Sequence, residues 1–123
     1  MMITKALDEC EEFVAGDGTN LREVLHPAND SVEMRYSLAH AYVRPGESSL
    51  PHRLAGSEAY YILEGVGVMH VNGETADIRA GCAIYVPPQA TQHIQNTGAT
   101  DLKFLCIVDP AWRAEDEEVR RKT

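Results

Sequence analysis

The chain has 123 residues, of which 44% are hydrophobic and 24% charged, a composition typical of one globular domain. Its formal net charge of −8 argues against nucleic acid or an anionic membrane surface as a partner. No run approaches the ~20 apolar residues of a membrane-spanning helix, and MMITKALDECEEF lacks the basic and apolar segments of a signal peptide.

The cysteines, Cys10, Cys82 and Cys106, are far apart and form no CxxC pair. This spacing excludes a zinc knuckle or a redox dithiol. Reduced, buried thiols are typical of cytoplasmic proteins, so we expect a cytoplasmic location.

The chain begins with mixed apolar and acidic residues and two glycines over residues 1–20, which we expect to form an extended arm over the domain. Runs rich in Val, Ile, Tyr and Leu then predict strands. These are residues 21–25, 32–43, 59–64, 67–71, 75–78, 83–86, 92–96 and 102–108. No amphipathic helix separates them, and eight short strands favour an all-β, double-sheet jelly roll.

The last segment, AWRAEDEEVRRKT, has acidic residues followed four positions later by basic ones. The pairs are Asp116–Arg120, Glu117–Arg121 and Glu118–Lys122. This order suits a short solvated helix, and a surface coil fits equally well. We therefore divide the single domain into an arm and edge strand (1–30), a barrel (31–109) and a helical or coil tail (110–123).

Two glycine-bordered motifs carry the functional information. The first, GESSLPHRLAGSEAYYILEG, contains Gly46, His52, Leu54, Glu58 and Gly65. The second, GCAIYVPPQATQHIQN, contains Gly81, Pro87, Gln89, Gln92 and Asn96. Together they resemble the signature motifs of the cupin superfamily, Gly-x5-His-x-His-x3,4-Glu-x6-Gly and Gly-x5-Pro-x-Gly-x2-His-x3-Asn. The resemblance implies a small single-domain cupin with a double-stranded β-helix, or jelly-roll, barrel.

Cupins usually hold a divalent metal through three histidines and one glutamate in these motifs. Here His52 and Glu58 match, whereas Leu54 and Gln92 replace two histidines. The Gln92 amide offers only a carbonyl oxygen, and Leu54 offers no ligand atom. We therefore expect a weak or partly occupied site for a divalent transition metal such as Zn, Fe, Mn or Ni.

Side chains alternate between the two faces of a strand, which places Glu58 with Tyr60 and Gln92 with Ile94. If these faces point inward, His52, Glu58 and Gln92 converge on one point inside the barrel. His93 lies on the opposite face and could join them only through a bulge or a register shift.

Two further residues are candidates for the site. His40 shares a face with Leu38 and Tyr42 and would supply a second imidazole to the metal if that face points inward. Otherwise it is a buried or interface histidine bonded to a carbonyl. Tyr60, beside Glu58, is a candidate catalytic acid or base, or a wall residue with a satisfied hydroxyl. Glu58 is the other catalytic candidate, or the partner of His52 in a metal-free pair.

Cupins include many kinds of enzyme and also binding proteins, so the fold does not choose the function. One hypothesis is a metal-dependent enzyme acting on a small oxygenated substrate. The alternative is a metal-free, non-catalytic module that binds a sugar or a small acid.

The strand at 102–108 is apolar on both faces, because Leu105 and Ile107 lie opposite its core-facing residues. A strand of this kind needs a cover on each face. The N-terminal arm or a second subunit could supply the outer cover, and cupins often pair their barrels. We therefore expect a homodimer.

Overall fold

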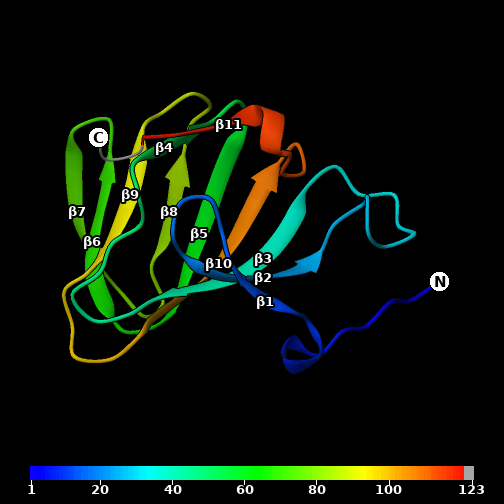
Figure 1. The fold of residues 1–123 in the computed structure, drawn as a ribbon, viewed down its shortest axis with the longest axis horizontal. Coiled ribbons are helices and arrows are strands. Elements are labelled where there is room, and N and C mark those ends of the chain that lie inside the picture. The colour runs from blue at the N-terminus through cyan, green and yellow to red at the C-terminus, as the bar shows by residue number, and fades with distance from the viewer. Residues whose placement is uncertain (121–123) are drawn as a thin grey trace.

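The structure, a computed structural model, describes residues 1–120 and consists of two facing antiparallel β-sheets (Figure 1). The first sheet has six strands in the order β1 (Glu12–Val14), β2 (Asn20–Leu25), β3 (Ser37–Val43), β10 (Leu102–Asp109), β5 (Ser57–Glu64) and β8 (Ala83–Val86). The second has five, in the order β11 (Glu117–Val119), β4 (His52–Leu54), β9 (Gln92–Asn96), β6 (Val66–Val71) and β7 (Glu74–Arg79). Two short 3-10 helices, η1 (Leu7–Glu9) and η2 (Ala114–Asp116), flank the strands. The prediction of an all-β jelly roll is confirmed.

All eight predicted strands are present, with small differences in their ends. The largest concerns the strand expected at 32–43, which begins only at Ser37. The preceding strand β2 ends at Leu25, which pairs with Leu38, so residues 31–36 have no strand beside them. Strands β1, β4 and β11 were not predicted because each spans three residues, too few to show an alternating pattern.

Alternation along β5 and β9 follows the expected parity. Tyr60 and Ile62 on β5 are buried, whereas Tyr61 and Leu63 between and beyond them are exposed. The inward faces of both sheets form one core, whose largest fully buried side chains include Phe104 and Ile94. On β9, Gln92 and Ile94 are likewise buried, so the inward direction expected from strand parity agrees with the structure in both motifs.

The turn before β9 keeps a left-handed backbone at the position where the cupin motif has glycine. Gln89 occupies this position with a φ of 67°, and its N–H donates to the Leu54 carbonyl at 2.8 Å. A left-handed conformation costs a non-glycine residue about 1–2 kcal/mol. The turn thus retains its shape and ties β4 to the start of β9.

Both flanking segments are built into the sheets. The N-terminal segment continues past η1 into the hairpin β1–β2 at the edge of the first sheet. The tail forms the three-residue 3-10 helix η2 and then strand β11 beside β4, a strand that neither the helix nor the coil expected here included. Asp116 bonds Arg113 at 2.9 and 3.0 Å, and Glu118 pairs with Arg53 across the strands at 2.7 Å.

The other expected partners in the tail, Arg121 and Lys122, lie outside the described residues. Within residues 1–120 there is no helix whose length and apolar content would allow it to cross a membrane.

Candidate functional site

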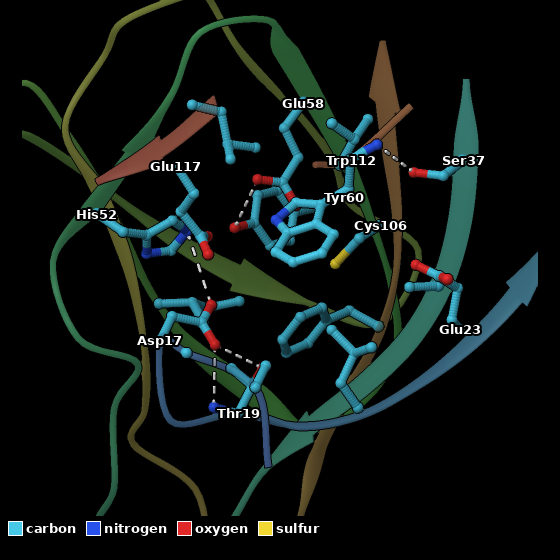
Figure 2. A pocket seen from close by; sticks show the side chains of 18 of the residues that line it. Asp17, Thr19, Glu23, Ser37, His52, Glu58, Tyr60, Cys106, Trp112 and Glu117 are labelled. Atoms are coloured by element: carbon cyan, nitrogen blue, oxygen red, sulfur yellow. Dashed lines mark hydrogen bonds and ion pairs between the residues drawn. The ribbon is translucent and has the colours of Figure 1, made fainter. Parts of the chain in front are cut away.

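A cavity of about 100 Å³ lies at the end of the barrel where the β1–β2 turn and β11 come together (Figure 2). Three polar residues of the first motif point into it: His52, Glu58 and Tyr60. Asp17 from the hairpin turn and Glu117 from β11 join them. Most of the remaining wall is apolar, including Ile94, Phe104 and Trp112.

His52 comes from β4, directly opposite Gln92 of β9, and is 3% exposed. Its Nδ1 lies 2.8 Å from the Leu50 carbonyl oxygen. Because a carbonyl only accepts hydrogen bonds, Nδ1 carries a proton and donates it. Nε2 consequently faces the cavity, 3.6 Å from Oδ2 of Asp17.

Asp17 is held in position by the turn that joins β1 and β2. Its Oδ1 accepts hydrogen bonds from the Thr19 backbone N–H at 3.1 Å and hydroxyl at 2.8 Å. Its carbonyl accepts one from the Leu50 N–H at 2.7 Å, which fastens the turn to the other sheet. Oδ2 is thereby directed towards His52 (Figure 2).

Glu58 is 7% exposed and its carboxyl group faces the cavity. Burial raises its pKa from 4.5 to about 7, and the charge of Asp17 adds to this, while nearby His52 acts in the opposite direction. A carboxyl group with a pKa near 7 is present in both protonation states at neutral pH, which suits a group that gives and takes protons.

Tyr60 links Glu58 to Gln92. Its hydroxyl donates to Oε1 of Gln92 at 2.5 Å and lies 3.4 Å from Oε1 of Glu58. Burial, followed by the charge of Glu58, raises the pKa of Tyr60 well above its usual value, so the phenol keeps its proton. Gln92 is 1% exposed and stands behind Tyr60, outside the cavity lining.

Glu117 enters the site through the register of β11. It pairs with Leu54 of β4, whose side chain points inward, while its neighbour Glu118 pairs with outward-facing Arg53. Opposite residues in an antiparallel pair share a face, so Glu117 also points inward. Burial raises its pKa, and the charge of Asp17 raises it further.

Sequence reasoning missed Asp17 and Glu117. The segment Gly16-Asp17-Gly18 is a turn signal that surrounds a carboxylate, and this is the one hint in the sequence for Asp17. Glu117 gives no such hint, because its inward direction depends on pairing with a strand more than sixty residues earlier in the chain. Cys106, also in the cavity wall, has its thiol pKa raised by burial and then by Glu58, so it remains a protonated thiol.

The condition under which His40 would become a ligand is not met. On β3 the residues Ser37, Ala41 and Val43 are buried, so His40 lies on the opposite, outer face. There it lines a surface groove with Arg22 and Lys103, and partial burial lowers its pKa. The structure therefore places the His40 imidazole away from His52.

His93 likewise points away from the cavity. Its ring stacks on that of His70 with centroids 4.0 Å apart and an interplanar angle of 13°. Burial, followed by the charge of His70, lowers its pKa. Neither His40 nor His93 completes a site with His52.

The side chains do not fit a metal centre of the usual cupin kind. Across residues 1–120, no three His, Cys, Asp or Glu side chains are grouped closely enough to hold a metal ion. The carbonyl oxygen of Gln92, its one donor atom for a metal, already accepts the Tyr60 proton. Leu54 fills another family ligand position with an apolar side chain.

Comparison with known proteins agrees with the motifs. A model of the cupin domain matches residues 39–108. An uncharacterized protein of Methanocaldococcus jannaschii is 37% identical over 119 residues, which covers 96% of this chain and 94% of that protein. An oxalate-binding protein of Thermotoga maritima is 39% identical over 83 residues, or 63% of this chain and 69% of that protein.

Among solved structures, the crystal structure of a predicted oxalate decarboxylase from Thermotoga maritima is similar, with a TM-score of 0.75 and 29% identity. The match covers 88% of this chain and 99% of that one. With its fold, both motifs and the matched domain in agreement, the chain belongs to the cupin family.

Proposed function

We propose that this cupin binds a small organic molecule in the cavity between its sheets and moves a proton to or from it without a metal. The observation that carries the proposal is the convergence of His52, Glu58 and Tyr60 on one largely apolar cavity. Apolar cavities with a few converging polar groups are the usual form of small-molecule sites. The relatives named for oxalate are in keeping with a small ligand.

In this proposal Glu58 is the acid and base, because its pKa of about 7 lets it exchange a proton near neutral pH. Tyr60 donates its one hydroxyl proton to Gln92 and lies 3.4 Å from Glu58. Its raised pKa makes it a poor acid, so its role is to position these groups. His52, fixed through Nδ1 by the Leu50 carbonyl, presents Nε2 to the ligand. Gln92 supports Tyr60 from behind.

The test is a screen of small alcohols, sugars, amines and acids by saturation-transfer NMR. We expect binders whose signal disappears in Ala39→Leu, which enlarges a side chain in the cavity wall. The same signal should persist in Ala76→Leu, the matched change at an exposed position on β7. If no compound depends on Ala39, the proposed function is wrong.

Proton transfer has its own readout. Incubated in D₂O, a bound ligand should gain deuterium at carbon with the native protein and not with Glu58→Gln. If the ligand binds but incorporates the same amount of deuterium with both proteins, Glu58 does not transfer the proton. The protein would then be a binding module, as in the metal-free alternative.

A metal-dependent enzyme is the second candidate function. It is favoured by Nε2 of His52 and Oδ2 of Asp17, which both face the cavity. Fixing Nδ1 on a carbonyl is also how ligating histidines are commonly oriented. The described side chains would have to rearrange to supply a third ligand.

We further propose that the protein is a homodimer joined through the outer face of β10. Ile107 is 41% exposed there, beside Leu38 and Ala59, and Leu105 lies next to exposed Tyr61. The N-terminal segment brings Leu7 to the groove beside His40 and Lys103 and leaves Ile107 exposed. A two-fold partner is therefore the remaining cover.

Light scattering should give about twice the chain mass of 13.6 kDa. Ile107→Glu should shift the mass towards one chain, because burying a carboxylate in an apolar interface is costly. Val66→Glu, a similarly exposed position on the second sheet, should leave the dimer intact. A native protein that is monomeric at micromolar concentration would contradict the proposal.

We also propose a cytoplasmic location, because Cys10, Cys82 and Cys106 are all free thiols.

A further inference from the structure

We propose that the ligand of the cavity is an organic amine, a cation with an apolar body, and that free carboxylates and phosphates are rejected. The inference rests on the proposed function in one respect, that the same cavity holds the ligand. It replaces the broad class of sugars and small acids with organic amines, and it separates the ligand of this chain from the oxalate for which two of its relatives are named.

The charges around the cavity are of one sign. Four carboxyl groups line it, those of Asp17, Glu23, Glu58 and Glu117. Throughout the described part of the chain, no lysine or arginine lines the same cavity, and His52 is the one basic side chain there. An anionic ligand would therefore enter a site that already carries excess negative charge.

Several carboxylates elsewhere on the molecule are paired with strong bases. Asp30 contacts Lys5, Asp116 bonds Arg113, and Glu118 bonds Arg53. Among residues 1–120, no lysine or arginine forms an ion pair with a cavity carboxylate. Asp17 contacts the Thr19 hydroxyl and His52, Glu23 accepts from the Asn29 amide, and Glu58 lies beside the Tyr60 phenol. The cavity thus gathers acids that lack a fixed cation in the described part of the chain.

The same groups disturb one another electrostatically. For both Glu58 and Glu117, burial is the main cause of a raised pKa, and the charge of Asp17 adds to it. A cation within about 4–6 Å of such carboxyls favours their ionised form and removes this penalty. A bound ammonium group would accordingly be stabilised by several carboxylates together.

The aromatic residues of the cavity wall suit the apolar body of such a ligand. Trp112 is 37% exposed and lines the cavity together with Phe104 and Tyr60. Figure 2 shows Trp112 and Tyr60 among the cavity side chains. Phe104 and Tyr60 pack with ring centroids 5.4 Å apart. Aromatic faces attract cations in addition to apolar groups.

Trp112 is the single tryptophan of the chain, which makes its fluorescence a direct probe of the cavity. Quenching should be measured with caesium, acrylamide and iodide at constant ionic strength, each normalised to N-acetyltryptophanamide. Because focused negative potential concentrates cations and repels anions, we expect normalised caesium quenching to exceed iodide quenching on the order of threefold.

Paired variants separate the cavity from the overall charge. Asp17→Asn with Glu117→Gln should raise iodide quenching towards the acrylamide value. Glu74→Gln with Asp77→Asn removes the same charge from exposed positions on β7, at the opposite edge of the second sheet, and should leave quenching unchanged. If iodide quenches Trp112 as strongly as caesium does, the inference is overturned. It is also overturned if the control variants change the quenching as much as the cavity variants do.

The ligand class is tested with three probes of one shape: benzylamine, benzyl alcohol and benzoate. Titration of the Trp112 fluorescence should show that the amine binds most tightly, the alcohol less tightly and the acid least tightly. The affinity for the acid should increase in the Asp17→Asn, Glu117→Gln protein. Benzoate binding as tightly as benzylamine overturns the inference and leaves the proposed function intact. Binding of all three that is indifferent to Ala39→Leu contradicts the proposed function instead.

Discussion

Glu58→Gln is expected to be more stable than the native protein above pH 7 and of about equal stability near pH 4. Burial raises the pKa of Glu58 from 4.5 to about 7, so the folded state holds this proton more tightly than the unfolded state. As the pH rises from about 4.5 to 7, the native protein loses free energy of unfolding. The loss is complete above pH 7 and amounts to about 3 kcal/mol. Because glutamine does not titrate, the Glu58→Gln protein does not undergo this loss of free energy of unfolding.

Urea unfolding of both proteins at pH 4 and pH 8.5 measures the effect. Glu74→Gln, an exposed position on β7, serves as the control and should follow the native protein at both values. A Glu58→Gln protein that is less stable than the native one at pH 8.5 would show that the Glu58 carboxylate has a stabilising partner. A tightly held metal ion is one such partner, so this experiment also bears on the second candidate function.

The double variant Leu54→His, Gln92→His is expected to bind Zn²⁺ or Ni²⁺ far more tightly than the native protein. It restores imidazoles at two positions of the cupin motif, and Leu54 and Gln92 are both buried beside His52. Loss of a group that only orients a metal ligand costs about 10–100-fold in affinity, so two added ligands should gain at least as much.

Isothermal titration of both proteins with each metal is the measurement. Since His70 and His93 stack on the outer surface, His93→Ala is the control, and it should leave the gain unchanged. A native protein that already holds metal as tightly as the double variant would show that Leu54 and Gln92 do not weaken the site.

Sequence reasoning was most reliable where motif spacing and strand parity agreed. The spacing gave His52 and Glu58 as site residues, and parity placed Glu58 and Gln92 on buried faces, as the structure shows. Gln92 nevertheless lies behind Tyr60, because a buried face specifies only the inward direction of a side chain and not the distance it reaches.

Parity failed for His40 because β3 carries apolar side chains on both faces. Leu38 and Tyr42 alternate with Ala39 and Ala41, so the sequence alone could not say which set points inward. The smaller residues face the core here, and the larger ones lie on the outer face. Asp17 and Glu117 escaped prediction for another reason, since a turn and a three-residue strand bring them to the cavity through contacts distant in sequence.

The pairing of β11 with β4 has a consequence for biosynthesis. A ribosome adds Glu117 one hundred residues after Asp17, when every strand of the matched domain at 39–108 has been synthesised. The cavity therefore receives Glu117 only when the last strand, β11, pairs with β4. A chain interrupted after residue 109 would keep the barrel strands β1–β10 and lack this last carboxylate.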